Sequence, residues 1–361
     1  MIKVILIVVS IIVITALFFV FTTNIASVSQ ALPDDRLKKG KFLNSEIEYK
    51  ISAGKIYKMM VAYFKDKRKE AVPSKVIPVE PVSQEQLVQL EGDLLYRLGH
   101  STIFMRLEGE YLLIDPVFSD RASPVQWAGP KRFHPSPIAI DKLPPIRAVM
   151  ISHDHYDHLD ISAIKQLNEK VEHFIVPLNV GKRIIDWGVS KSKIVELDWS
   201  QEINIGAIRL TATPAQHFSG RSMLDSDKTL WASWVIQTDK TRLFFSGDSG
   251  YFSGFKEIGE RYGPFDIAMV ETGAYNELWS DIHMMPAESL QAHIDLNAQW
   301  MMPIHNGTFD LALHDWYTPF DEISALADQA KVKLLTPQFG EAVTLDNIHQ
   351  TQKWWKALRP Q

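Results

Sequence analysis

The pattern of apolar and polar positions divides the chain into an apolar N-terminal run, a polar stretch and a long region of short alternating elements. Positions 4–21 carry no charge, and within them only Ser10 and Thr15 interrupt the apolar character. A helix rises about 1.5 Å per residue, so a run of this length crosses most of a bilayer core. We therefore predict a membrane anchor or signal segment over residues 1–24, with a single-pass anchor favoured.

Two other interpretations of this run remain open. A cleaved signal peptide has an apolar region of about 7–15 residues before small residues at the cleavage site, and Ala26–Ser29 offers such residues. A buried helix of a soluble domain is the third interpretation. The length of the run favours an uncleaved anchor and hence a membrane location. Lys3 on one flank and the basic residues from Arg36 on the other leave the side of the membrane open.

From Asp93 onward, β-like runs alternate with helical patterns. A turn at Glu108–Glu110 indicates a hairpin at the start of this region. The expected strands are 94–98, 102–107, 111–114, 148–151, 173–176, 194–197, 208–213, 231–238, 242–246, 266–270, 301–304 and 332–335; the expected helices start near Asp160 and cover 252–262 and 287–296. Hairpins mixed with strand–helix units favour two sheets covered by helices, an αββα sandwich of the α/β class, over one parallel sheet. We assign this domain to residues 93–361.

Charge is distributed unevenly along the chain, whose formal net charge is −5. The segment 36–75 has twelve Lys or Arg against four acidic residues and carries +8, whereas 76–361 carries −12. Residues 25–92 are therefore interpreted as a basic juxtamembrane and connector region, able to lie on anionic headgroups or to remain solvated. The acidic body argues against a nucleic-acid partner.

The chain contains no cysteine. Disulfides, thiol nucleophiles and cysteine-ligated zinc are excluded, so any metal site must use His, Asp or Glu.

Four potential metal ligands follow the apolar strand 148–151 directly. These are His153, His155, Asp157 and His158. His153 and His155 are two positions apart at a strand end and can meet one ion, whereas Asp157 and His158 lie on the following turn and point elsewhere. The spacing therefore indicates two metal ions. Imidazole and carboxylate ligands suit zinc, with iron or manganese as alternatives.

Three further candidate ligands each follow a strand-like run. They are His217, Asp248 and His305. Strand ends gather on one rim of such a sheet arrangement, so we expect these side chains to join the first four.

These motifs resemble the metallo-β-lactamase superfamily. The stretches around them resemble, more narrowly, its N-acyl-phosphatidylethanolamine-hydrolysing phospholipase D branch, over roughly residues 94–342. The stretches that carry this resemblance are Gly99–Thr102, Asp115–Ser119, Arg121–Pro124, Gly129–Phe133, His153–Asp160, Pro214–His217, Gly247–Tyr251 and Tyr262–Asp266. Asn306 departs from the pattern, because the family tends to have Trp there.

The resemblance implies a metallo-β-lactamase-like αββα fold with a dinuclear zinc site. By position, one ion would be held by His153, His155 and His217, the other by Asp157, His158 and His305, and both by a bridging Asp248. It implies a phosphodiesterase that acts on membrane phospholipids through a hydroxide shared by the metals. Two ions about 3.5–4 Å apart lower the pKa of such a water to near 7.

Several other residues receive expected roles. His283, which matches a family His ahead of a helix, is the candidate for substrate contact or for protonation of the leaving group, beside Asp248 as the second catalytic residue. Asp115 is expected to orient metal ligands. Lys131 and Arg132 are candidates for pairing with a lipid phosphate, and Trp279 for lining an acyl groove.

Two rival functions remain open at this point. One is a lactonase or other ester hydrolase of the same fold, and the other is a non-catalytic, membrane-tethered metal or lipid binder. The complete set of seven ligands favours an enzyme over a binder.

Overall fold

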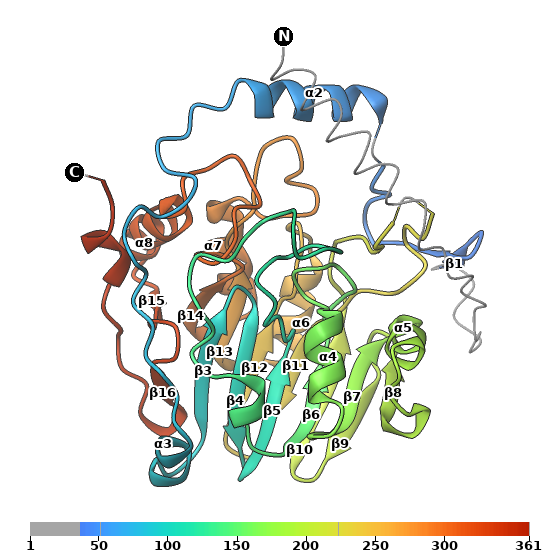
Figure 1. Cartoon of the computed structure of the whole chain (residues 1–361), viewed down its shortest axis with the longest axis vertical. Coiled ribbons are helices and arrows are strands. Elements are labelled where there is room, and N and C mark those ends of the chain that lie inside the picture. The colour runs from blue at the N-terminus through green and yellow to red at the C-terminus, as the bar shows by residue number, and fades with distance from the viewer. Residues whose placement is uncertain (1–36, 51, 223, 361) are drawn as a thin grey trace.

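The computed structural model describes residues 37–50, 52–222 and 224–360. In this part of the chain, two seven-stranded sheets lie face to face (Figure 1). The first sheet has the order β16-β3-β4-β5-β6-β7-β8. Its strands are β3 (Leu94–Gly99), β4 (Thr102–Leu107), β5 (Glu110–Ile114), β6 (Ile146–Met150), β7 (Val171–Pro177), β8 (Ile194–Leu197) and β16 (Ala342–Thr344).

The second sheet has the order β15-β14-β13-β12-β11-β10-β9. Its strands are β9 (Glu202–Ile205), β10 (Ile208–Thr213), β11 (Ser233–Gln237), β12 (Arg242–Phe245), β13 (Phe265–Glu271), β14 (Ala298–Ile304) and β15 (Lys333–Leu334). Each sheet is antiparallel at one side and parallel at the other. The predicted αββα arrangement is confirmed, and the expected strands are found within a few residues of their predicted bounds.

Three hydrophobic layers hold the sheets and helices together. Side chains such as Ile103 of the first sheet and Trp234 of the second form the layer between the sheets. A second layer joins the first sheet to α3 (Gln84–Gln89), α4 (Ile161–Leu167) and α5 (Val180–Asp186). A third joins the second sheet to α6 (Gly254–Tyr262), α7 (Pro286–Asp295) and α8 (Thr318–Ala330). Full burial of one large apolar side chain contributes about 1.5–3 kcal/mol, so these layers dominate the stability of the fold.

Short 3-10 helices complete the domain: η1 (Ile140–Lys142), η2 (Lys191–Lys193), η3 (Leu345–Asn347) and η4 (Trp354–Ala357). Helix α4 begins where the sequence predicts it, because the Asp160 carboxylate accepts hydrogen bonds from the backbone N–H groups of Ser162 and Ala163.

The strand directions bring the loops that carry the predicted metal ligands to one rim of the sandwich. Strands β3, β5 and β6 run the same way in the first sheet, as do β10, β12, β13 and β14 in the second. The loops that follow these strands carry the seven predicted ligands, and they lie on the same side of the sandwich.

The segment before the sandwich folds onto the same rim. It contains β1 (Leu37–Lys38), β2 (Lys41–Phe42) and α2 (Ala53–Phe64), which crosses above the sheets (Figure 1). Helix α2 starts at Ser52, whose hydroxyl accepts a hydrogen bond from the Lys55 N–H. The expected connector is therefore partly ordered against the domain.

The expected membrane location is contradicted by the structure. Among the described residues, no helix combines the length and the apolar character needed to cross a bilayer. The longest helix in this part is α8, with 13 residues, whereas a span needs about 20. The run at 4–21, on which the expectation rested, lies outside the described residues.

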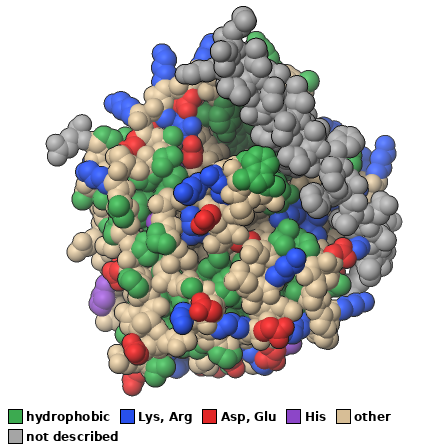
Figure 2. Space-filling model, in the orientation of Figure 1, with side chains coloured by type: hydrophobic (Ala, Val, Ile, Leu, Met, Phe, Trp, Pro, Cys, Tyr) green, Lys and Arg blue, Asp and Glu red, His purple; other side chains and the backbone are tan. Residues whose placement is uncertain are grey.

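The surface charge is interspersed on the face shown in Figure 2, where acidic and basic side chains alternate with apolar ones. This face shows no broad track of a single sign of charge.

Candidate metal centre

The ligand loops start directly after buried strands, which fixes their positions. Strand β6 ends at Met150 and leads into Ser152 and His153, while β12 ends at Phe245 and leads through Gly247 into Asp248. Gly247 has φ +58°, and a Cβ there would lie 2.8 Å from Cβ of Ser152. A side chain at position 247 would therefore clash with the neighbouring ligand loop, and only glycine allows the two loops to meet.

The first group of donors consists of His153, His155, His217 and Asp248. Nδ1 of His155 lies 2.9 Å from Nε2 of His153 and 3.2 Å from Nε2 of His217. Oδ2 of Asp248 lies 3.7 and 3.8 Å from Nε2 of His153 and His217. Tetrahedral zinc with bonds near 2.0–2.1 Å needs ligand atoms about 3.3 Å apart. The four distances lie on both sides of that value, so the spacing of this group suits one tetrahedral divalent metal ion.

The second group consists of Asp157, His158 and His305, joined by His100. Oδ2 of Asp157 lies 2.9 Å from Nε2 of His100, 3.2 Å from Nε2 of His305 and 3.5 Å from Nε2 of His158. All four donor atoms lie within 4.8 Å of one another. The spacing again suits one cation.

Asp248 contacts both groups with different oxygens. Oδ1 lies 3.1 Å from Nε2 of His158, and Oδ2 lies 3.1 Å from Nε2 of His305. Within the described chain, Nε2 of His158 and Oδ1 of Asp248 are buried, and apart from this contact with each other neither atom has a hydrogen-bond partner. Buried polar atoms without partners are costly, so this pair is a fitting place for a cation. The residues present thus fit two metal ions that share Asp248.

Hydrogen bonds behind the ligands fix the imidazole orientations. Oδ2 of Asp115 lies 2.7 Å from Nδ1 of His158, and Asp115 also accepts hydrogen bonds from the N–H and hydroxyl of Ser152 at 2.7 and 2.5 Å. Nδ1 of His217 donates to the carbonyl of Ile282 at 3.0 Å. Such contacts expose the opposite ring nitrogen to a metal. Asp115 thus lies behind His158 and Ser152, and its role in orienting metal ligands stays a prediction.

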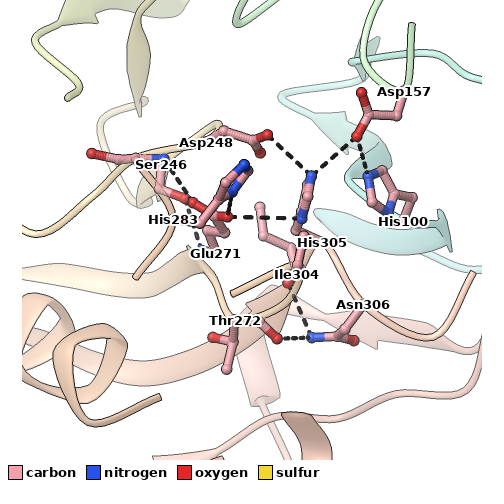
Figure 3. Close-up of polar contacts among 12 residues, drawn as sticks. His100, Asp157, Ser246, Asp248, Glu271, Thr272, His283, Ile304, His305 and Asn306 are labelled. Carbon is pink, nitrogen blue, oxygen red and sulfur yellow. Dashed lines mark hydrogen bonds and ion pairs between the residues drawn. The ribbon is translucent and has the colours of Figure 1, made fainter. Parts of the chain in front are cut away.

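A buried carboxylate links His283 to the same centre. Oε1 of Glu271 contacts Nδ1 of His283 and lies 3.8 Å from Nδ1 of His305, while Oε2 accepts a hydrogen bond from the Ser249 N–H at 2.7 Å. Figure 3 shows the Glu271 carboxylate in contact with both imidazoles, beside Asp248. His283 is therefore next to the predicted ligands, as the sequence analysis expects.

The charges of the centre are strongly coupled. Burial opposes the charged form and holds the pKa of His153 well below its usual value. Burial acts the same way on His158 and His305, but Asp248 and Asp157 outweigh it, so the pKa of His158 lies well above its usual value and that of His305 at about 10. Burial would raise the pKa of both carboxylates, yet the imidazoles hold them well below their usual range. The carboxylates are thus ionised and require cations beside them, whether protons on imidazoles or divalent metals.

Three residues of the centre have left-handed backbone conformations. The φ angles are +47° for His100, +43° for Asp115 and +64° for His305. Each such position costs on the order of 1–3 kcal/mol in a residue other than glycine, and such positions are concentrated at functional sites. Local strain therefore marks the same rim as the donor geometry.

Two members of the centre, His100 and Glu271, are not among the residues predicted from the sequence. His100 follows β3 directly, and Glu271 is the last residue of β13. That position was the available signal, because His217, Asp248 and His305 follow their strands in the same way.

The three expected substrate contacts lie elsewhere in the loops. Lys131 is exposed and pairs with Arg121 through an isolated β-bridge. The Arg132 guanidinium donates to the carbonyls of Val117 and Ser119. The Trp279 indole is buried and donates to a backbone carbonyl at 2.6 Å, although its own carbonyl accepts from the His283 N–H. Their roles toward substrate stay predictions.

Asn306, which departs from the family pattern, has a structural role. Its Oδ1 accepts from the buried Arg97 at 2.8 Å, and its amide donates to the carbonyls of Thr272 and Ile304. These bonds fix the loop that begins with His305.

Comparisons with known proteins agree with this geometry. A model of the beta-lactamase superfamily domain matches residues 110–306. An uncharacterized protein of Mycobacterium tuberculosis is 42% identical over 262 residues, which cover 72% of this chain and 70% of that protein. The N-acyl-phosphatidylethanolamine-hydrolyzing phospholipase D 1 of Caenorhabditis elegans is 35% identical over 266 residues, which cover 70% of this chain and 74% of that one. A mitochondrial protein of the same enzyme name from Saccharomyces cerevisiae is 31% identical over 261 residues, which cover 69% and 55%.

Solved structures share the fold. Igni18, a metallo hydrolase from Ignicoccus hospitalis, superposes with a TM-score of 0.55 at 20% identity and covers 70% of this chain and 97% of its own. An isothiocyanate hydrolase from Delia radicum gut bacteria gives 0.56 at 19% identity and covers 69% and 98%.

Fold and centre together define a metal-dependent hydrolase. The chain belongs to the metallo-β-lactamase superfamily, in the branch of the N-acyl-phosphatidylethanolamine-hydrolysing phospholipases D.

Proposed function

We propose that this protein is a phospholipase D-type phosphodiesterase that acts on N-acyl-phosphatidylethanolamine-like phospholipids with two zinc ions. The observation that carries the proposal is the pair of donor groups that share Asp248. The all His and Asp donor set supports zinc, and the names of the nematode and yeast relatives support the substrate class.

Two bound zinc ions would supply Lewis acidity, making water more acidic and neutralising charge on a phosphodiester. The chain itself supplies the orientation. Asp115 and the Ile282 carbonyl hold His158 and His217 in fixed rotations before substrate arrives. Preorganised donors require little rearrangement during the reaction.

The leaving group needs a proton, and we assign its delivery to His283, which lies beside the candidate metal centre. Cleavage of the bond between phosphorus and the headgroup oxygen expels the alkoxide of an N-acylethanolamine. Burial lowers the pKa of His283 to about 4, so its imidazole is neutral. Burial and the charge of Asp248 hold the pKa of Glu271 well above its usual value, so Glu271 keeps its proton at the contact with Nδ1.

In the proposed step, His283 and Glu271 together move one proton to the leaving group, and His283 stays neutral. Nε2–H of His283 gives its proton to the leaving oxygen while Glu271 gives its own to Nδ1. Positioned acid catalysis of this kind contributes about 10²–10⁴-fold.

Product analysis tests the proposal. Full-length, zinc-loaded protein is incubated with vesicles that contain N-acyl-phosphatidylethanolamine, phosphatidylethanolamine and phosphatidylcholine, and the lipids are followed by mass spectrometry. We expect phosphatidic acid and N-acylethanolamine in equal amounts, with little product from the His283→Gln variant. Hydrolysis of lactones without any phosphatidic acid would overturn the proposal in favour of an ester hydrolase.

A further inference from the structure

A cleft of about 430 Å³ opens beside the candidate metal centre. One wall is the segment 38–50, and the other includes His217 and Phe218. Four lysines contribute to the lining: Lys38, Lys39, Lys41 and Lys50. We call this space the lysine cleft.

The lysine-bearing segment is tied firmly to the body of the protein. Oδ1 of Asn44 accepts from the His217 N–H at 2.9 Å, and its amide donates to the His217 carbonyl at 2.8 Å. Phe42 is buried in the central core, and its N–H donates to the Asp227 carbonyl at 2.8 Å. The segment that forms one wall of the cleft is thus fixed to the opposite wall by hydrogen bonds to the backbone of His217, a predicted metal ligand.

Aromatic contacts connect the cleft to the metal centre. The Tyr49 ring lies 5.5 Å from the Phe218 ring, which lies 4.5 Å from the imidazole of His155. A molecule in the cleft would therefore lie next to His217 of the first donor group, with Phe218 between it and His155.

The charge of the cleft is unbalanced. Lys41 pairs with Asp227 at 3.5 Å and Lys50 with Glu48 at 2.9 Å. No carboxylate of the described residues lies within ion-pair distance of the exposed Lys38 and Lys39. Among the charged side chains that line the cleft, four lysines against the carboxylates of Glu48 and Asp227 leave a net charge of +2.

We infer that the lysine cleft, which borders the metal centre at His217, is a phosphate-binding site whose positive charge comes from residues 38–50. Lysine acts as a point charge toward phosphate, and the net charge of +2 on the described lining residues matches the charge of a phosphate monoester. Tyr49 and Phe218 also line the cleft, and its volume of about 430 Å³ leaves room for a glycerol or alkyl group attached to the phosphate. The inference goes beyond the proposed function, since it holds whatever the metal centre hydrolyses.

Lysine labelling tests it without any readout of hydrolysis. Pyridoxal 5′-phosphate carries a phosphate and an aldehyde that condenses with a lysine amine, with loss of water; borohydride fixes the adduct, and mass spectrometry locates it. In full-length, metal-loaded protein we expect Lys38 and Lys39 to react about tenfold faster than Lys65 and Lys67, and excess glycerol 3-phosphate to protect them. Equal labelling of the four lysines, or labelling without protection, would overturn the inference.

The protecting agent identifies the source of the phosphate. At matched phosphate concentration, stronger protection by phosphatidic acid vesicles than by glycerol 3-phosphate assigns the cleft to a lipid headgroup, provided phosphatidylcholine vesicles do not protect. Equal or stronger protection by glycerol 3-phosphate assigns it to a soluble phosphate. Uniform protection of all four lysines by vesicles indicates general charge attraction and contradicts the site.

Matched variants provide a second measurement. Lys38→Gln/Lys39→Gln and Lys65→Gln/Lys67→Gln remove the same charge from exposed positions inside and outside the cleft. We expect calorimetric binding of glycerol 3-phosphate to weaken about tenfold in the first pair and to stay within about twofold in the second. An equal effect in both pairs would contradict the inference.

Discussion

Nδ1 of His158 lies 2.7 Å from Oδ2 of Asp115, and both side chains are fully buried. The same carboxylate binds Ser152, the residue before His153. One carboxylate behind the ligands therefore orients members of both donor groups. Substitution of Asp115 should therefore weaken metal binding although Asp115 is not itself a predicted metal ligand.

We expect Asp115→Asn to weaken metal binding by about 10–100-fold, because the imidazole of His158 loses the acceptor that fixes its rotation. Metal content and activity are measured across a zinc titration, and activity should return at high zinc. Asp160→Asn is the control, since Asp160 caps α4 and accepts hydrogen bonds from the backbone N–H groups of Phe118 and Ser119 in the loop after β5. Equal loss of metal in both variants would show a general folding defect instead.

The loss of activity on substitution of His283 or Glu271 should depend on the leaving group of the substrate. We expect His283→Gln and Glu271→Gln to lower kcat about 10²–10⁴-fold on a phospholipid, whose alkoxide needs a proton. An aryl phosphodiester with a nitrophenolate leaving group needs none, so it should lose far less. The comparison is made with metal content held at the wild-type level. The same loss on both substrates would contradict a role in proton transfer.

Acid should destabilise the fold through histidines away from the centre. Burial lowers the pKa of His293 in α7 to about 4 in the folded state, against a usual value of 6.5. As the pH falls from 6.5 to about 4, His293 therefore takes up a proton in the unfolded chain before it does so in the folded protein. The free energy of unfolding is fully retained above pH 6.5 and falls by up to about 3 kcal/mol towards pH 4. His293→Leu should flatten the wild-type curve in that range, as measured by urea unfolding; an unchanged slope would contradict the assignment.

Metal removal should lower thermal stability. The ionised Asp157 and Asp248 lose cations when a chelator strips the protein. A ligand present at about 100 times its Kd stabilises the folded state by about 2.7 kcal/mol. We expect a fall in Tm of several degrees by calorimetry, reversed by added zinc. A Tm that does not respond to chelator would argue against tight metal binding.

Much of the fold and most of the centre could be predicted from the sequence. Predicted metal ligands such as His153 and His305 come within a few residues of the ends of apolar strands, and strands of one direction end at the same rim. The expected αββα arrangement followed from the same strand pattern.

Long-range contacts could not be predicted. Asn44 meets His217 across 173 positions of sequence, so nothing local indicates that the N-terminal segment closes over the rim. Glu271 owes its role to a contact with His283 that only tertiary packing creates. Helix α8 was not predicted, although Pro319 stands at its start. Its apolar residues recur with only a weak helical period, and packing against the rest of the domain stabilises the helix. The membrane location was wrong because it depended on apolar length alone, and no described helix provides it.

The most direct test is a zinc titration of the metal-free, full-length protein with hydrolysis of N-acyl-phosphatidylethanolamine followed at each step. If two ions share Asp248, the release of phosphatidic acid should rise with zinc and level off at about two equivalents per chain. Asp248→Ala should abolish that release. Full release of phosphatidic acid without metal, or saturation with zinc and no phosphatidic acid at all, would contradict the account.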